Sequence, residues 1–328
     1  MPASALDRRH FAQVLVAGLV LVPLVGNAQT PAKIRRVGFL SPGDPFTEDQ
    51  IREDWRDMEA LGWIEGKNII VERRFGTHSQ MRQLADELVR LKVELIRTNG
   101  TDATLAAKEA TTTIPIIMDP VADPVGSGLV ASLAHPGGNI TGYSLLGPEI
   151  VAKRIALVRE LLPGLRRVAL PFIPSRVAAL GRNGIDAAHR SVGIEPLFFA
   201  VTSVQAYREG IADAARQGAQ AVQDMGLGSS ILYPIEEVTV ATKARLPVIT
   251  PDDDVLQAGA LMLIAPDNEE ESRRVAAIQD KILKGANPGD IPVEQPTRFR
   301  MVINLKAAKT LGLTIPKSML QRADDVIR

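Results

Sequence analysis

The stretch that decides the fold runs from Val93 to Met118 and reads VELIRTNGTDATLAAKEATTTIPIIM. Two short runs rich in aliphatic and β-branched residues, 93–97 and 114–118, flank an alanine-rich segment, 101–111, that favours a helix. A strand, a helix and a second strand in this order form a crossover, which joins parallel strands. The segment 98–101 then lies at the carboxyl end of the first strand, between that strand and its helix.

The same alternation extends in both directions from this unit and predicts an α/β fold with parallel sheets covered by helices on both faces. The other expected strands cover 37–40, 68–72, 140–144, 167–172, 196–201, 219–224 and 247–250. They fall into two blocks, separated by a predicted helix over 148–162. Two blocks of four to five strands suit two doubly wound parallel-sheet lobes better than one very wide sheet.

The C-terminal tail has the short elements that a chain needs to cross back between two lobes: an apolar run over 260–265, a charged helix over 267–284 and another apolar run over 299–305. Several crossovers make a hinge, and ligands of such sheets bind beyond the carboxyl ends of the strands. We therefore expect a ligand cleft between the lobes. The expected division is a leader over 1–28, a first lobe over 29–144 plus about 262–296, and a second lobe over 145–261 plus about 297–328.

The N-terminal segment has the pattern of a secretory signal peptide. Arg8 and Arg9 precede an apolar run over 11–25, and small residues follow up to Ala28. The paired arginines also resemble a twin-arginine signal, although Asp7 stands where that signal usually has Ser or Thr. The alternative is a buried N-terminal helix. The signal-peptide interpretation predicts an exported protein, located in the periplasm and without a stable membrane anchor.

Composition excludes several classes of protein. The 328 residues include 38 basic and 38 acidic ones, so the basic excess typical of nucleic-acid-binding proteins is missing. Aromatic residues make up 4% of the chain, which disfavours stacking platforms for bases or sugars. There is no cysteine, which removes disulfides, thiolate nucleophiles and Cys-ligated metals.

The motifs that suggest a cofactor or a metal have simpler explanations. Gly126 to Ala131 match the dinucleotide pattern GxGxxA, but two prolines separate them from the preceding strand, so a Gly-rich helix start is favoured. The histidines at 78, 135 and 189 stand far apart and are interpreted as isolated surface residues. Asp252 to Asp254 suit a helix start better than a cation site. We expect no cofactor and no metal.

Three loops that follow strands carry small polar and acidic residues: 41–44, 98–102 and 119–123. Backbone N–H groups and hydroxyls of 98–101 suit a carboxylate or another anion, because they precede a helix. Asp119 and Asp123 suit an ammonium group or ligand hydroxyls. The equal alternative is that these residues only cap their loops.

The stretch from Thr111 to Gly142, TTTIPIIMDPVADPVGSGLVASLAHPGGNITG, strongly resembles one family. It is the ABC-transporter substrate-binding proteins related to the tryptophan/tyrosine-binding group, which have the type I periplasmic-binding-protein fold. Three further segments agree with it: VGFLS at 37–41, KRIALVRELLP at 153–163 and NLKAAKTLGLTIP at 304–316. The resemblance implies a solute-capturing protein that closes on its ligand and delivers it to a membrane permease with an ATPase subunit.

The ligand-binding residues that the resemblance implies lie in the loops described above and in their counterparts of the second lobe. In the first lobe they are Ser41, Asn99, Gly100, Thr101, Asp119, Asp123 and Ser144. In the second lobe they are Phe172, Ser175, Asp224, Met225, Thr250 and Asp252. The chain departs from the aromatic-amino-acid binders at 171–175 and at 223–226, so the ligand class widens to amino acids and related small carboxylates or amides.

The sequence therefore predicts a monomeric, non-enzymatic binding protein of an ABC importer, with a small-molecule solute and no nucleic acid as partner. An exported sensor component of the same fold is the first alternative. An exported α/β enzyme is a more distant one, because no nucleophile–base pair or metal cluster is recognisable. A repressor of the same fold is excluded, because a leader stands where its DNA-binding helices would be.

Overall fold

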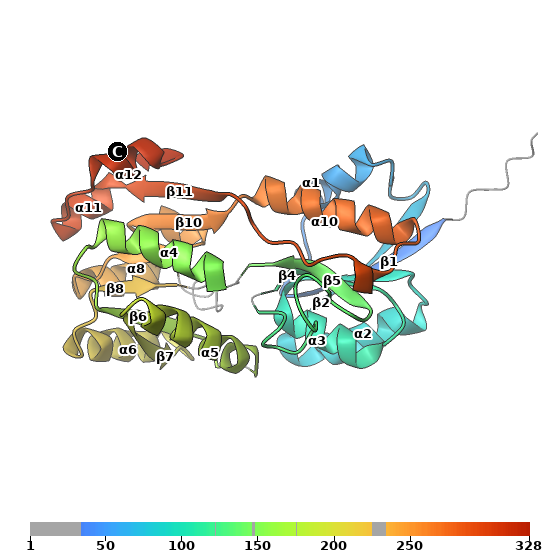
Figure 1. Cartoon of the computed structure of the whole chain (residues 1–328), viewed down its shortest axis with the longest axis horizontal. Helices are drawn as coiled ribbons and strands as arrows, with labels where there is room; N and C mark the ends of the chain where they lie inside the picture. Colours follow the sequence, from blue (N-terminus) through green and yellow to red (C-terminus); the bar gives the residue numbers. More distant parts are fainter. Residues whose placement is uncertain (1–33, 122, 146–147, 175, 225–233) are drawn as a thin grey trace, which may run out of the picture. The chain divides into compact units, whose positions relative to one another are not determined.

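The computed structural model describes residues 34–121, 123–145, 148–174, 176–224 and 234–328. The predicted leader over 1–28 and two predicted ligand-binding residues, Ser175 and Met225, lie outside this part of the chain. The described residues contain two sheets with helices on both faces, so the α/β prediction with two parallel-sheet lobes is confirmed (Figure 1).

The first sheet has five parallel strands in the order β2-β1-β3-β4-β5. Its strands are β1 (Arg35–Pro42), β2 (Ile69–Gly76), β3 (Leu95–Thr98), β4 (Ile116–Val121) and β5 (Ile140–Ser144). Because all five are parallel, their carboxyl ends meet at one edge, which is where loops can converge on a ligand.

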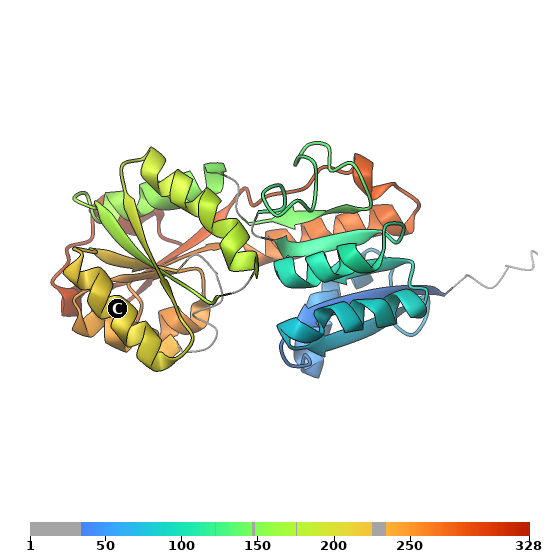
Figure 2. The same cartoon turned by 90° about the horizontal axis from the view of Figure 1, so that it is seen from below.

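Two pairs of helices cover this sheet. On one face, Trp55 and Met58 of α1 (Glu48–Ala60) pack with Val275 and Ile278 of α10 (Asn268–Leu283), and Figure 1 shows the two helices side by side. On the other face lie α2 (Met81–Arg90) and α3 (Gly100–Ala110), drawn in blue-green in Figure 2, with the short turn η1 (His78–Gln80) before them. The apolar side chains of both faces alternate along the strands, as expected for a sheet buried on both sides.

The second sheet has seven strands in the order β12-β11-β10-β9-β8-β6-β7, parallel except for the β10–β11 pair. They are β6 (Arg167–Phe172), β7 (Glu195–Ala200), β8 (Ala221–Gln223), β9 (Val248–Thr250), β10 (Met262–Pro266), β11 (Phe299–Asn304) and β12 (Asp325–Ile327). One face carries α4 (Pro148–Leu161), α5 (Arg176–Ser191), α11 (Leu305–Leu311) and α12 (Lys317–Arg322). The other carries α6 (Val204–Arg216), α8 (Pro234–Lys243) and α9 (Asp253–Gln257).

The tail crosses between the sheets later than its sequence suggests. The apolar run over 262–266, which we grouped with the first lobe, is β10, and it pairs with β9 and β11 in the second sheet. The chain then enters α10 on the first sheet, passes the turn η2 (Pro288–Asp290) and returns to the second sheet as β11. Near the point where the chain crosses between the sheets, a strand of either sheet is equally apolar. The sequence pattern alone therefore does not show which sheet the run over 262–266 joins.

Candidate functional site

Ser41 and the predicted turn after β3 lie together at the carboxyl edge of the first sheet. Ser41 is buried near the end of β1, and the Asn99 side-chain amide donates a hydrogen bond to its hydroxyl oxygen at 3.2 Å. Asn99 also precedes α3, whose first residue Gly100 has a φ of +81°, a conformation that favours glycine. Thr101 is buried in the first turn of that helix. The register of β3 beside β1 brings these residues together.

Asp123 and Ser144 lie near the same edge, but the contacts of Asp123 fit the loop-capping alternative. The Asp123 carboxylate accepts a hydrogen bond from the Gly126 backbone N–H at 2.8 Å, and its carbonyl accepts one from the Ser127 hydroxyl. The segment 124–128 forms turns, and no helix occurs between Gly126 and Ile140, so the predicted helix start is wrong and the geometry of a dinucleotide loop is missing here as well. Ser144 is buried at the end of β5.

A charged cluster around Arg97 is the most unusual feature of this edge. The Arg97 guanidinium pairs with Asp54 of α1, and its Nε lies 2.9 Å from a carboxylate oxygen of Asp119 in β4. It also lies over the ring of Phe39, 5.0 Å from its centre. Glu271, in the first turns of α10, shares a hydrogen bond with Asp119. Four elements that are far apart in the sequence thus contribute charges to one cluster.

Asp119 and Glu271 together hold one proton. Burial raises the pKa of Glu271 to about 8, and the negative charge of Asp119 adds to this effect. Burial also raises the pKa of Asp119, whereas the neighbouring Arg97 charge lowers it. Since Arg97 stabilises the ionised form of Asp119, Glu271 is the protonated partner at neutral pH.

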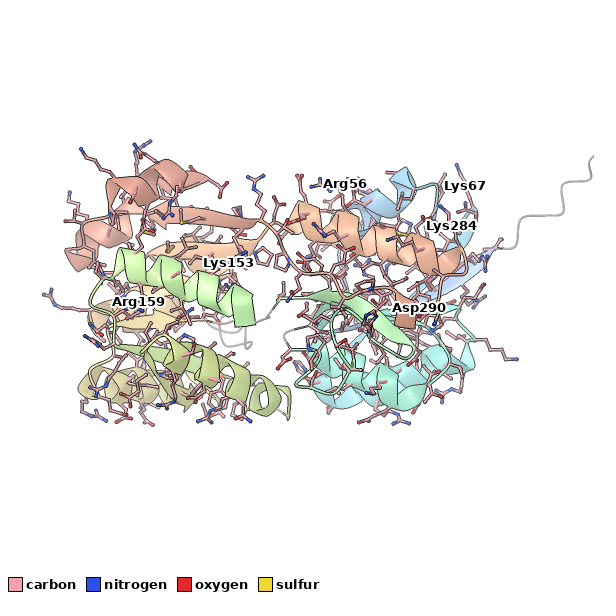
Figure 3. All side chains as sticks on the ribbon, viewed as in Figure 1. Arg56, Lys67, Lys153, Arg159, Lys284 and Asp290 are labelled. Carbon is pink, nitrogen blue, oxygen red and sulfur yellow. The ribbon has the colours of Figure 1, made fainter. Side chains whose placement is uncertain are left out.

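A cavity of about 490 Å³ opens beside this cluster between α1 and α10. Arg97 and Asp119 line it from the sheet, and Phe46 lines it from the segment before α1. The ring of Phe46 packs against those of Phe39 and Phe75, with ring centres 5.5 and 5.1 Å apart. The helices contribute Gln50, Glu53, Asp54, Arg56, Met58, Asn268, Glu269, Glu271, Ser272, Val275 and Ala276, and Figure 3 labels Arg56 on α1. The cavity is large enough for a solute of amino-acid size.

The sequence analysis missed Asp54, Arg97 and Glu271. Arg97 could have been recognised from the sequence, because a charged side chain inside an otherwise apolar strand needs a partner of opposite charge. Its partners could not be recognised in the same way. Asp54 lies on an amphipathic helix among other acidic residues, and Glu271 belongs to a run of three glutamates.

In the second sheet, three predicted residues follow neighbouring strands. Asp224 is buried directly after β8, and the Thr250 hydroxyl at the end of β9 donates a hydrogen bond to it at 3.4 Å. The Thr250 oxygen also accepts from the Asp252 backbone N–H. The Asp252 carboxylate caps α9 by accepting from two backbone N–H groups, as the helix-start interpretation of 252–254 predicts. Phe172 ends β6, and the Arg182 guanidinium lies 5.3 Å from its ring centre.

Two further ionisable side chains, Arg154 and Glu237, are buried close to Asp224. Arg154 of α4 donates a hydrogen bond to the Ile264 carbonyl at 2.8 Å, and burial lowers its pKa to about 10 although Asp224 opposes the shift. Glu237 of α8 is 1% exposed, and neither of its carboxyl oxygens has a hydrogen-bond partner within the described residues. Burial, with the charges of Asp224 and Asp252, raises the pKa of Glu237 to about 9, so it is neutral at pH 7.

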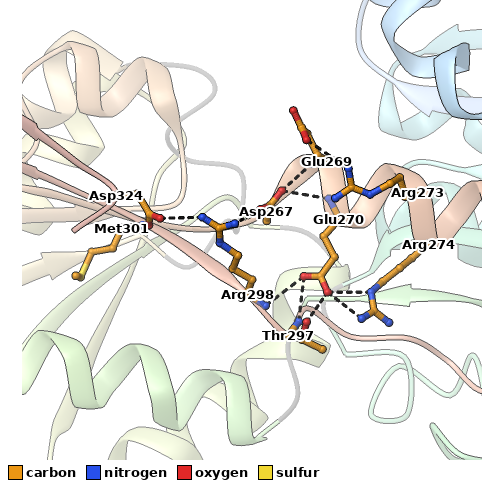
Figure 4. Close-up of polar contacts among 9 residues, drawn as sticks. All are labelled: Asp267, Glu269, Glu270, Arg273, Arg274, Thr297, Arg298, Met301 and Asp324. Atoms are coloured by element: carbon orange, nitrogen blue, oxygen red, sulfur yellow. Dashed lines mark hydrogen bonds and ion pairs between the residues drawn. The ribbon is translucent and has the colours of Figure 1, made fainter. Parts of the chain in front are cut away.

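Polar contacts join the two segments that pass between the sheets (Figure 4). Glu270 of α10 bonds the Thr297 hydroxyl and backbone, the Arg298 backbone N–H and the Arg274 guanidinium. Arg298 in turn donates to Asp324 at 3.0 Å and lies 3.7 Å from Asp267. The start of α10 and the start of β11 are therefore tied to each other side by side.

The histidines and the acidic groups do not assemble a metal site in the described part of the chain, where no cluster of three or more suitable side chains occurs. His78 is exposed and contacts Asp102. The interpretation of His189 as a surface residue is wrong: it is fully buried, with its ring nitrogens 2.8 Å from the Ile185 carbonyl and 3.1 Å from the Gln223 amide oxygen. Within the described ranges, no helix has the length and apolar character needed to cross a bilayer.

Comparison with known proteins agrees with this architecture. Residues 56–327 match the family model of the ABC transporter substrate binding protein. A tyrosine-binding protein of Clostridioides difficile is 26% identical over 268 residues, which cover 78% of this chain and 74% of that protein. A conserved domain protein of Vibrio cholerae has a TM-score of 0.78 at 25% identity, covering 90% of this chain and all of that one. A Streptococcus ABC domain in complex with L-Trp has the same fold, with a TM-score of 0.78 at 24% identity over 89% of this chain and 99% of that one.

Proposed function

Because the chain belongs to the ABC transporter substrate binding protein family, we propose that it captures a small polar solute by lobe closure and delivers it to a membrane permease. The observation that carries this proposal is the polar edge of each parallel sheet. Ser41 and Asn99 contact each other at the first edge, Asp119 lies in the carboxyl-terminal half of the nearby strand β4, and Asp224 and Thr250 contact each other at the second edge. Ligands of open α/β sheets bind at such edges, where loops supply polar groups and helices supply backbone N–H donors.

The solute class that we propose is an amino acid or a related small carboxylate or amide. The relatives support it, because one is named for tyrosine binding and another was solved with L-Trp. The cavity beside Arg97 has the volume for such a molecule, and the ring of Phe46, which packs against the rings of Phe39 and Phe75, supplies an apolar wall. Aromatic amino acids are therefore the first solutes to test. The proposed ligand-binding residues remain those of the two edges, together with Phe172, Ser175 and Met225.

The proposed setting is the periplasm, with an ABC permease and its ATPase subunit as partners and the protein itself as a monomer. The signal-peptide pattern over 1–28 supports export, and the family supports the transporter partners. We propose no enzymatic activity, because the matched relatives are substrate-binding proteins. Cell fractionation tests the location: the protein is expected in the periplasmic fraction, and its retention in the cytoplasm with an intact leader would contradict export.

A thermal-shift screen tests the binding function. The purified protein is heated with each of the standard amino acids, and with small carboxylates, amides and sugars. A solute present at about one hundred times its dissociation constant is expected to stabilise the protein by roughly 2.7 kcal/mol, a clear rise in the unfolding midpoint. Chemical conversion of a bound solute would contradict the transport function and favour an enzyme instead.

A further inference from the structure

We propose that the cavity between α1 and α10 binds the primary ammonium group of the solute, and that this ammonium replaces the proton shared by Asp119 and Glu271. The inference rests on the proposed solute-binding function, and it specifies which chemical group of the solute the first lobe binds. Asp119 comes from β4 and Glu271 from α10, and both line the cavity. Two hydrogen-bonded carboxyl groups at the wall of a cavity offer oxygen acceptors that an ammonium group can bind.

The charges around Glu271 favour a cation. From the elements packed against it, the groups that line the cavity or face its carboxyl are Glu53, Asp54, Arg56, Arg97, Asp119 and Tyr143. Arg97 is paired with Asp54 and Asp119, and Arg56 and Glu53 are exposed to water. On its own helix, Glu269 pairs with Arg273, and Glu270 is engaged by Thr297 and Arg298. Three partly buried carboxyl groups, Asp54, Asp119 and Glu271, thus face one partly buried cation, Arg97.

The Tyr143 hydroxyl is a buried donor, unpaired in the described part of the chain, whose pKa responds to the charge of Glu271. Tyr143 of β5 is fully buried, and its hydroxyl has no hydrogen-bond partner within the described residues. Burial raises the pKa of this hydroxyl, and among the charged groups Glu271 adds most to the rise. An unpaired buried donor is costly. An ionised Glu271 attracts such a donor more strongly than a neutral one does.

An ammonium fits this cavity better than the other occupants of its size. A carboxylate-only solute would face Asp54, Asp119 and Glu271. Of the two cations that line the cavity, Arg97 is already paired with Asp54 and Asp119, and Arg56 is exposed to water and lies beside Asp57. A metal ion needs a set of ligands that the described residues do not assemble here. A primary ammonium needs a few oxygen acceptors, and the ring of Phe46, which lines the cavity, can contact the organic part of its molecule.

The exchange is balanced in protons and charge. The free site holds one proton and one negative charge on the pair; the bound site holds two carboxylates and the ammonium, and the displaced proton passes to the solvent. Because the free pair titrates with a pKa of about 8 at Glu271, protons compete with the solute below that pH. Affinity is therefore expected to rise by up to about tenfold per pH unit between about pH 6 and 8, and then to level off.

Isothermal titration calorimetry tests the exchange. L-Tyrosine and L-tryptophan are titrated into the full protein near pH 7 in two buffers of different ionisation enthalpy, and each is compared with its analogue that lacks the amino group. We expect the release of about one proton for each amino acid bound, and binding of the amino-free analogues that is at least about tenfold weaker. The Glu271→Gln variant keeps the size and polarity of the neutral side chain, so it is expected to fold, to release no proton and to bind with a flat pH profile.

The outcomes separate this inference from the proposed function. Glu195→Gln, a change at an exposed carboxylate of β7, is the control and is expected to behave like the unmodified protein. Binding without proton release, or amino-free analogues that bind as tightly as the amino acids, would overturn the proton exchange and leave solute binding intact. If neither the amino acids nor their analogues bind at any pH, the proposed solute class fails, and this inference fails with it.

Discussion

At the scale of the residue, Arg97 shows how a buried charge organises the first-lobe edge. Its guanidinium contacts both Asp54 and Asp119, and its side chain is 12% exposed. Removing one partner from such a cluster leaves charges that are buried and uncompensated, which costs more than the cluster itself contributes.

The Arg97→Met variant is expected to lose about 3–5 kcal/mol of unfolding free energy, because Asp54 and Asp119 then stay buried without a cation. Arg97→Lys keeps the charge but cannot contact both carboxylates in the same geometry, so a smaller loss is expected. Urea denaturation at neutral pH measures both. Equal stability of Arg97→Met and the unmodified protein would mean that the cluster is not buried as described.

Glu237 predicts a specific pH dependence of stability. Its pKa is about 9 in the folded state and near 4.5 when the chain is unfolded, so the folded state holds an extra proton between these values. Its contribution is fully present below about pH 4.5 and is lost as the pH rises toward 9, by at most about 1.4 kcal/mol per pH unit. Glu237→Gln removes this loss.

The unfolding midpoints of Glu237→Gln and the unmodified protein are therefore compared from pH 5 to pH 9. The difference in midpoint is expected to shift in favour of the variant as the pH rises, because the other titrating groups are common to both proteins. A difference that stays constant over this range would contradict the neutral, buried state of Glu237.

Sequence reasoning at this scale found residues that follow strands, and it missed those that reach the site from helices. That Ser41, Asn99 and Asp119 lie at the same edge of the first sheet was predictable, since the carboxyl ends of parallel strands share an edge. Glu271 was not, because it enters from a helix that returns to the first sheet about 150 residues after Asp119 and nothing local marks it.

At the scale of the element, the alternation of strands and helices could be predicted from the sequence. The residues at which the chain crosses from one sheet to the other could not. The start of α1 follows a local rule: threonine is favoured at helix N-termini, and the Thr47 hydroxyl accepts a hydrogen bond from the Gln50 backbone N–H while the Gln50 side chain accepts one from the Thr47 backbone N–H. In contrast, β10 was assigned to the wrong sheet, because composition does not encode which neighbour an apolar strand will have.

The close approach of β4 and β5 gives an element-scale prediction. Gly142 has a φ of +140°, and a Cβ added there would lie 2.2 Å from the Met118 carbonyl oxygen. Both atoms are held by the sheet, so Gly142→Ala is expected to destabilise the protein by at least about 2 kcal/mol. The control is Gly164→Ala, where an added Cβ has open space and a loss below about 0.5 kcal/mol is expected. Similar unfolding midpoints for the two variants would contradict the described strand spacing.

At the scale of the whole molecule, the two-lobe architecture was predictable because each lobe repeats the same strand–helix alternation. What the pattern could not supply is the identity of the solute. The segments 171–175 and 223–226, where the sequence analysis expects selectivity, lie partly outside the described residues. The charged residues at the edge of the first sheet restrict the solute class instead, since they favour a solute that carries an ammonium group.

The measurement that tests the central claim most directly is calorimetric titration of the solute found in the thermal-shift screen into three proteins: unmodified, Asp119→Asn and the exposed control Asp213→Asn. The unmodified protein and the control are expected to bind one solute per chain with the same affinity. Asp119→Asn is expected to bind at least about tenfold more weakly while staying folded, because a carboxylate at the edge of the first sheet has become a neutral amide. Unchanged affinity in Asp119→Asn would contradict the claim that this edge holds the solute.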